Sequence, residues 1–197
     1  MTTIAFVRHG LTDFNREMRA QGHLNNPLNE AGILQAKQVA KRLAEENWDM
    51  ILSSDLWRAR QTAERIAEEL GAPVSGFDVR LREIGRGQLE GTIEEERIAR
   101  WGPDWRELDL GEESHESVRE RGIGFVRDVA AQYAGKKVLA VSHGFLIGQT
   151  LKALMQDETT GERLRNTSVT TVVHNGDRWE YRLYNCIRHL DPNLMEG

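Results

Sequence analysis

Short apolar runs alternate along the chain with longer segments that have helical periodicity. The first run covers residues 4–7 (IAFV), and similar runs follow at 50–52 and 138–141. Runs of this length, rich in branched side chains, are typical of buried strands. Between them, segments such as 56–70 place apolar residues three or four positions apart. This alternation of strand and helix predicts a doubly wound α/β fold with a mainly parallel sheet.

Polar residues that can accept hydrogen bonds from backbone amides stand before the helical segments. Asn29, Asp55 and Ser114 each precede such a segment, and we expect each of them to cap the helix that follows. Gly71 and Pro73 are predicted to end the helix that begins after Asp55. These positions set the expected bounds of three helices.

The last part of the chain has strand character throughout. Residues 169–173 and 179–184 flank Asn175-Gly176, a pair that favours a tight hairpin. The outer strand of this hairpin would have an unpaired edge, which could pair with a second copy in a homodimer. We expect the tail after His189 to be frayed.

Two stretches do not fit the alternation. Residues 10–29 predict a long polar loop, and loops of this length are often functional. Residues 85–113 predict a small insertion over the sheet edge, with a short helix at 93–101 broken by Gly102-Pro103. We therefore expect residues 1–197 to form a single domain, a three-layer α/β/α sandwich with a cap inserted at about 85–113.

Composition narrows the class of protein. Hydrophobic residues make up 39% of the chain and charged residues 29%, as in ordinary globular proteins. The net charge of -5 does not favour a nucleic-acid partner. Cys186 is the only cysteine, which favours a reducing compartment. No apolar run approaches the roughly 20 residues that span a bilayer, and no signal-peptide pattern is present, so we expect no membrane partner and a cytoplasmic location.

Two of the predicted strands end in a histidine followed by a glycine. His9-Gly10 follows Arg8 at the end of the first strand, and His143-Gly144 ends the strand at 138–141. Ligands bind at the carboxyl ends of parallel strands, so His9 and His143 would meet there if their strands are neighbours. Arg58, in the first turn of the helix after residues 50–55, would reach the same edge. Two arginines and two histidines around one point favour a phosphoryl ligand.

A histidine beside a bound phosphoryl group could also act as a nucleophile. Attack of a neutral His9 on phosphorus would give a phosphohistidine, which water could then hydrolyse. The arginines and His143 would stabilise the charge on the phosphoryl oxygens. The leaving alkoxide would need a proton from a carboxylic acid that is partly shielded from water. Glu83, in the glycine-rich loop of residues 83–91, is the candidate for this acid, and Glu90 is its rival.

Five blocks of the chain, in the same order, resemble the motifs of the histidine phosphatase superfamily, the phosphoglycerate mutase-like proteins. They are RHGLT (8–12) with Asn15, QG (21–22) with PLNEAG (27–32), SSDLWRARQTA (53–63), LREI (81–84) with Gly87, Glu90 and Gly91, and SHG (142–144). The resemblance runs from about Phe6 to Val173. One departure is Leu11, where that family usually carries Glu or Gln; this position is not the nucleophile, so it bears on the polarity of the pocket rather than on activity.

The resemblance assigns roles to individual residues. It implies that His9 is the phosphorylated nucleophile and that Glu83 is first the proton donor and later the base. The residues that it implies for phosphoryl and substrate binding are Arg8, Asn15, Gln21, Gly22, Arg58 and His143. It thus predicts a phosphatase that acts on a small phosphorylated metabolite, without a metal or other cofactor.

Three alternatives stay open at this point. The two histidines could bind a metal with Asp13 or Asp55, but the chain lacks a metal-ligand spacing and two arginines would repel a cation. A mutase with a bisphosphate cofactor would resemble this chain in its core, although such mutases tend to be longer. A binding module without turnover is disfavoured because both His9 and Glu83 are present.

Overall fold

A six-stranded sheet forms the centre of the protein, for which a computed structural model describes residues 1–158, 163–176 and 178–194. The strands are β1 (Thr2–Arg8), β2 (Met50–Ser53), β3 (Gly76–Phe77), β4 (Lys137–Ser142), β5 (Val169–His174) and β6 (Trp179–Cys186). Their order in the sheet is β3-β2-β4-β1-β5-β6. The first four strands of that order run parallel, whereas β5 and β6 are antiparallel to their neighbours. The sheet is therefore mainly parallel, as predicted.

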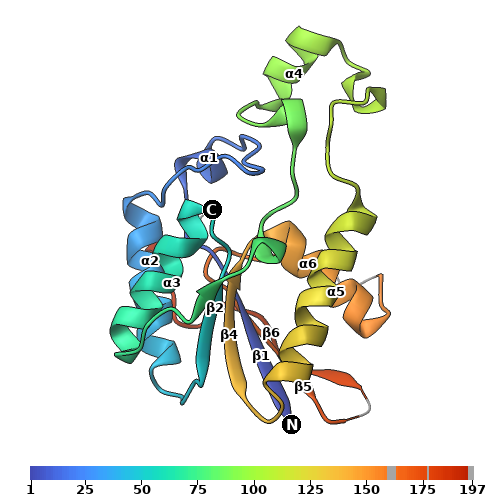
Figure 1. Ribbon diagram of the computed structural model, residues 1–197. Helices are drawn as coiled ribbons and strands as arrows, with labels where there is room; N and C mark the ends of the chain where they lie inside the picture. Colours follow the sequence, from blue (N-terminus) through green and yellow to red (C-terminus); the bar gives the residue numbers. More distant parts are fainter. Residues whose placement is uncertain (159–162, 177, 195–197) are drawn as a thin grey trace.

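Helices cover both faces of this sheet. The helices are α1 (Asp13–Arg16), α2 (Glu30–Leu43), α3 (Trp57–Leu70), α4 (Glu94–Trp101), α5 (His115–Gln132) and α6 (Gly144–Met155). Figure 1 shows α2 and α3 on one side of the sheet and α5 and α6 on the other, whereas α4 stands apart beyond the end of the strands. This is the expected three-layer α/β/α arrangement.

The alternation of side chains along β1 explains the two hydrophobic cores. Ile4 and Phe6 point to one face and pack with residues of α5 and α6. Ala5 and Val7 point to the other face and pack with residues of α2 and α3. All four are buried, and full burial of a side chain such as Phe6 contributes about 1.5–3 kcal/mol to folding. Strand β1 is thus fixed from both sides, which makes its end a rigid base for a site.

Two of the three predicted helix caps are confirmed and one is wrong. Asn29 accepts a hydrogen bond from the Gly32 amide at 2.9 Å, and Ser114 accepts one from the Ser117 amide at 3.1 Å. Asp55 does not cap α3, because both its carboxylate oxygens accept hydrogen bonds from the Arg82 guanidinium. A bidentate pair with arginine is stronger than a bond to neutral amides, so it takes the carboxylate away from the helix.

The 10–29 loop and the C-terminal tail also differ from expectation. The loop of residues 10–29 contains the short helix α1, because Thr12 and Asn15 each accept a hydrogen bond from the other's amide. The tail is packed rather than frayed as far as Leu194, whose carbonyl accepts a 2.7 Å hydrogen bond from Gln35. Residues 195–197 lie outside the described part. The hairpin through Asn175 and Gly176 joins β5 to β6 as predicted.

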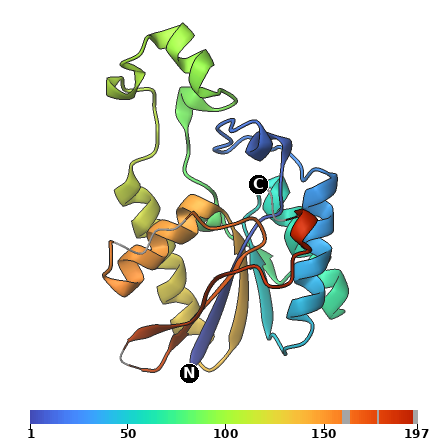
Figure 2. The ribbon, with the colours of Figure 1, turned by 180° about the vertical axis from the view of Figure 1, so that it is seen from behind.

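Residues 85–113, which we call the cap segment, rise beyond the carboxyl ends of β1 and β4 (Figures 1 and 2, in green). They have a small apolar cluster of their own, in which Leu89, Trp105 and Leu110 are buried and Trp101 packs against them. Among the described residues, no helix combines the length and the apolar character needed to cross a membrane.

Candidate active site

His9 and His143 meet at the carboxyl end of the sheet, as the sequence predicts. Strands β1 and β4 are parallel neighbours with Arg8 opposite Ser142, so the next residue of each strand is a histidine at the same level. The two ring centroids lie 5.1 Å apart. Both rings are almost completely buried, with 2% of His9 and 0% of His143 exposed.

The hydrogen bonds of His9 determine which ring nitrogen carries the proton. Its Nδ1 lies 2.7 Å from the Gly10 carbonyl oxygen. A carbonyl oxygen can only accept, so Nδ1 is the donor and Nε2 keeps the lone pair. Burial, together with the charges of Arg58 and Arg8, holds the pKa of His9 well below its ordinary value of 6.5. The His9 ring is therefore neutral at neutral pH, and its Nε2 is unprotonated.

His143 is held from the neighbouring strand. Its Nε2 lies 2.9 Å from the hydroxyl of Ser54, which follows directly after β2. Its Nδ1 is buried and has no hydrogen-bond partner within the described part of the chain. Burial and the charge of Arg58 keep the pKa of His143 well below 6.5. Nδ1 is thus a polar atom that lacks a protein partner at the centre of the site.

Arg8 and Arg58 bring two buried guanidinium groups to the histidines. Arg8 donates to the Leu164 carbonyl at 2.5 Å, and Arg58 donates to the Gly22 and Leu24 carbonyls at 2.9 Å each. Neither forms a salt bridge with a carboxylate of the described residues, and the Nε of each is buried without a partner. Burial lowers the pKa of each to about 10, so both remain cations at neutral pH. Buried cations without carboxylate partners are costly and indicate an anion-binding function.

Two predicted residues of the 10–29 loop, Gln21 and Gly22, form hydrogen bonds at and around Arg58. Gly22 has a φ of +48°, and a Cβ at this position would lie 2.1 Å from the Glu90 carboxylate, so only glycine brings this carbonyl to Arg58. The Gln21 side-chain oxygen accepts hydrogen bonds from Thr12 at 3.0 Å and from Asn26 at 2.6 Å.

Glu83 lies beside the start of α6, the helix that directly follows His143. Its carboxylate accepts hydrogen bonds from the Leu146 amide at 3.2 Å and the Phe145 amide at 3.3 Å, at the start of α6. The rival Glu90 is engaged elsewhere, with its carboxylate bonded to the amides of His23 at 2.8 Å and Arg86 at 3.1 Å. Glu83 lines the cavity above the histidines and Glu90 does not.

These side chains surround a cavity of about 780 Å³ between the sheet edge, the 10–29 loop and the cap segment. The predicted site residues that line the cavity are Arg8, His9, Asn15, Gln21, Gly22, Arg58 and Glu83. His143 lies against His9. Leu11 is 1% exposed and is not part of the cavity wall, so its departure from the family pattern does not change the polarity of this wall.

Sequence reasoning missed five arginines that line the cavity and one residue, Asn166, that supports His9. The further arginines that line the cavity in the described chain are Arg19, Arg86, Arg97, Arg106 and Arg163. The density of arginine in the cap segment was a signal that could have found three of them. Asn166 was missed as well: its amide donates to the His9 carbonyl at 3.0 Å and to the Asn15 side chain at 3.3 Å. No local pattern marks that residue.

The carboxylates considered for a metal site are bonded to other groups. Asp13 accepts a hydrogen bond from the Asn29 side chain at 3.0 Å, and Asp55 pairs with Arg82. Within the described residues, no group of three or more His, Cys, Asp or Glu side chains is placed to hold a metal ion. The chemistry that the site offers is that of two neutral imidazoles, two guanidinium groups and one carboxylate.

Comparison with known proteins finds relatives that match nearly the whole chain. A protein of Bacillus subtilis (strain 168), named as the uncharacterized phosphatase PhoE, is 34% identical over 192 residues, which cover 96% of this chain and 97% of the relative. A probable phosphoglycerate mutase, GpmB of Cronobacter sakazakii, is 36% identical over 192 residues, covering 91% of this chain and 88% of the relative.

A solved structure of a mycobacterial glucosyl-3-phosphoglycerate phosphatase, in complex with VO3, matches with a TM-score of 0.82 at 30% identity. The match covers 93% of this chain and 98% of that chain. The family model of the histidine phosphatase superfamily (branch 1) matches residues 4–187. The chain therefore belongs to the histidine phosphatase superfamily and is a phosphatase.

Proposed function

We propose that the protein hydrolyses phosphate monoesters of a small metabolite through a phosphohistidine at His9, without a metal ion. One observation carries this proposal. A neutral His9, whose Nδ1 proton is held by the Gly10 carbonyl, lies in a buried site with two guanidinium groups that lack carboxylate partners. A dianionic phosphoryl group supplies the missing partner for the arginines and the electrophile for His9 Nε2.

In the first step, His9 Nε2 attacks phosphorus and the bond between phosphorus and the ester oxygen breaks. The leaving alkoxide takes a proton from the Glu83 carboxylic acid. Arg8 and Arg58 stabilise the charge on the phosphoryl oxygens, as preorganised donors do in phosphoryl transfer. We assign the same role to His143, since Ser54 can donate to its Nε2 and so place the ring proton on the unpartnered Nδ1.

In the second step, a water molecule takes the place of the alcohol. The Glu83 carboxylate accepts its proton while the water oxygen attacks phosphorus. The bond between phosphorus and Nε2 breaks, which releases inorganic phosphate and returns His9 to its neutral form. The cycle consumes one ester and one water and needs no other reactant.

The cap segment completes the cavity and is the part that we propose selects the alcohol portion of the substrate. It contributes Trp105 and three arginines to a wall that stands opposite the histidines. The relatives carry the names of phosphatases for phosphorylated metabolites and of mutases, and this range of names fits a common phosphoryl site with different outer walls.

The test is hydrolysis of p-nitrophenyl phosphate in the presence of EDTA. We expect turnover that resists EDTA and that falls by about 10⁴-fold or more in His9→Ala, because the nucleophile is lost. His174→Ala is the matched control, since His174 stacks on Trp179 in the terminal hairpin and should leave turnover unchanged. A rapid quench with ³²P-labelled substrate should trap a phosphohistidine in the native protein.

Three results would contradict the proposal. Loss of activity with EDTA would indicate a metal-dependent reaction, and normal activity in His9→Ala would exclude this nucleophile. Transfer of a phosphoryl group to 3-phosphoglycerate from a bisphosphate primer, faster than hydrolysis of any ester, would instead identify a mutase.

A further inference from the structure

Arg121 on α5 does not line the cavity, yet it holds the segment that carries Glu83. All five of its N–H groups donate hydrogen bonds, which is the full capacity of a guanidinium group. The acceptors are the Arg80 carbonyl (2.8 Å), the Arg82 carbonyl (2.5 Å), the Glu83 carbonyl (3.0 Å) and the two carboxylate oxygens of Glu113 (2.9 and 3.0 Å). Three backbone carbonyls within the four residues that end at Glu83 are thus bonded to one side chain.

Glu113 connects this arrangement to the base of the cap segment. Its carboxylate accepts a hydrogen bond from the Gly85 amide at 3.1 Å, and its own amide donates to the Gly85 carbonyl at 2.8 Å. Burial alone would raise the pKa of Glu113, but hydrogen bonds from Arg121, Gly85 and Ser117 outweigh burial and lower it to about 2. Glu113 is therefore a permanent carboxylate that orients the Arg121 guanidinium and joins the two ends of the cap segment.

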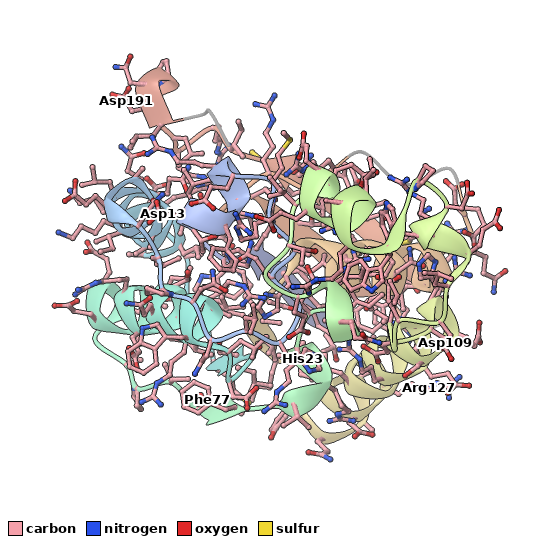
Figure 3. All side chains as sticks on the ribbon, turned by 90° about the horizontal axis from the view of Figure 1, so that it is seen from above. Asp13, His23, Phe77, Asp109, Arg127 and Asp191 are labelled. Atoms are coloured by element: carbon pink, nitrogen blue, oxygen red, sulfur yellow. The ribbon has the colours of Figure 1, made fainter. Side chains whose placement is uncertain are left out.

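A second group holds the Glu83 carbonyl from the opposite side. His23 Nε2 lies 2.8 Å from this oxygen, and because a carbonyl only accepts, Nε2 carries the proton. Figure 3 shows His23 where the 10–29 loop meets the chain that leads into the cap segment. The backbone of Glu83 is thus bonded both to α5 and to the 10–29 loop.

The carboxylate end of Glu83 is placed mainly by α6. It accepts hydrogen bonds from the Phe145 and Leu146 amides at the start of α6 and from the amide of the next residue, Ile84, at 3.0 Å. Helices α5 and α6 are in close contact beside Arg121, since a Cβ on Gly122 would lie 2.0 Å from the Thr150 hydroxyl. The backbone of Glu83, held by α5, and its carboxylate, placed by α6, are therefore fixed relative to one another.

We infer that Arg121, oriented by Glu113, is a positioning residue that sets where the Glu83 carboxyl group meets the leaving oxygen. This inference rests on the proposed function, in which Glu83 is the general acid. A misplacement of a reacting group by about 1 Å can cost about 10²-fold in rate, so the position of the Glu83 backbone matters for protonation. Arg121 does not line the cavity, and none of its five hydrogen bonds goes to a side chain of the proposed phosphoryl site.

A positioning role for the acid has a signature that a purely structural role lacks. An alkyl alkoxide is a poor leaving group and needs the proton from Glu83, whereas p-nitrophenolate leaves without one. Damage to the acid therefore lowers the ratio of alkyl to aryl phosphate hydrolysis. Partial unfolding lowers both reactions equally and leaves the ratio unchanged.

The experiment compares kcat/KM for glycerol 2-phosphate and p-nitrophenyl phosphate in four variants. Glu83→Gln should lower the alkyl-to-aryl ratio by about 10²-fold, because general-acid catalysis is worth at least that much. Arg121→Lys keeps the charge but loses the fork of donors, and should lower the ratio by about tenfold. Glu113→Gln should also lower the alkyl-to-aryl ratio, but by less than tenfold. Arg119→Lys is the control on the same helix, because Arg119 donates to Gln149 and Glu158 instead.

The outcomes separate the inference from the function on which it rests. An unchanged ratio in Glu83→Gln would show that Glu83 is not the acid, and the proposed function would need revision. A reduced ratio in Glu83→Gln with an unchanged ratio in Arg121→Lys would overturn the inference alone. A reduced ratio in Arg119→Lys as large as in Arg121→Lys would also overturn it, because the effect would then be general to α5.

Discussion

Both walls of the cavity contain arginines, but the arginines of the two walls have different partners. The buried wall (Arg8, His9, Arg58 and His143) is where we propose that the phosphoryl group binds. Its arginines are bonded to backbone carbonyls and form no ion pair with a carboxylate in the part of the chain that the structure describes. The cap wall (Arg86, Arg97, Trp105 and Arg106) pairs its arginines with carboxylates. Arg86 lies 2.6 Å from Glu112, and Arg106 lies 2.8 Å from Glu94 with 64% of its side chain exposed.

The difference separates strength of binding from choice of substrate. At the buried wall, the arginines are shielded from bulk solvent and feel the charge of Glu83 without a direct ion pair, so we expect a strong interaction with an anion. At the cap wall, charges are partly neutralised and screened by solvent, so each contributes little and can rearrange. We therefore expect one wall to be needed for every substrate and the other to discriminate among them.

The largest effect should come from the buried wall. Arg58→Met removes a donor to the phosphoryl group, and kcat/KM for p-nitrophenyl phosphate should fall by about 10³-fold, as for the loss of one oxyanion donor. Arg60→Met is the matched control on the same helix, where Arg60 is exposed and paired with Glu64. A fall of less than tenfold in kcat/KM for Arg58→Met would show that the buried Arg58 charge contributes little to catalysis.

A smaller effect should appear in the dependence of stability on pH. His9 and His143 stay neutral in the folded protein, whereas in the unfolded chain each takes up a proton as the pH falls below about 6.5. The unfolded state then binds more protons, so the free energy of unfolding should fall with falling pH, by up to about 1.4 kcal/mol per pH unit for each histidine.

Urea unfolding between pH 7 and pH 5 measures this slope. His143→Asn should reduce the slope by about one histidine's share. Ile66→Val, a control on the buried face of α3, should lower stability at every pH and leave the slope as in the native chain. An unchanged slope in His143→Asn would mean that this ring takes up a proton in the folded protein as well.

The smallest effect should come from the cap wall. Arg106→Gln should raise KM for an anionic metabolite by about fivefold or less at low salt, leave kcat unchanged, and lose this effect as ionic strength rises. Arg100→Gln is the control, because Arg100 lies over Trp101 and does not line the cavity. A fall in kcat would place Arg106 in the chemical step and would remove the distinction between the two walls.

The buried wall could be predicted from sequence because its residues follow regular elements directly. Arg8-His9 ends β1, His143 follows β4, and Arg58 lies in the first turn of α3. Only one long-range assumption was needed, that β1 and β4 are neighbours. The direction and the end of a parallel strand then determine where the next side chain lies.

The other parts of the site depend on contacts that no local pattern encodes. An acid before a helix has the same pattern whether it caps the helix or, like Asp55, pairs with an arginine 27 residues away. Arg121 sits on an ordinary helix, and three of its five hydrogen bonds go to backbone carbonyls, which carry no sequence signal. Thr167, whose amide donates to the Arg8 carbonyl, has a φ of +54°, which is rare for a β-branched residue and cannot be predicted from its type.

The two buried guanidinium groups also link turnover to the stability of the fold. Two neighbouring buried cations oppose folding until an anion lies between them, so any bound phosphate shifts the folding equilibrium toward the native state. At a concentration 100 times its dissociation constant, such a ligand adds about 2.7 kcal/mol to the free energy of unfolding. The reaction product is such an anion, and its affinity comes from the same charges that stabilise the transition state. We therefore expect inorganic phosphate both to slow the next cycle and to protect the protein from unfolding.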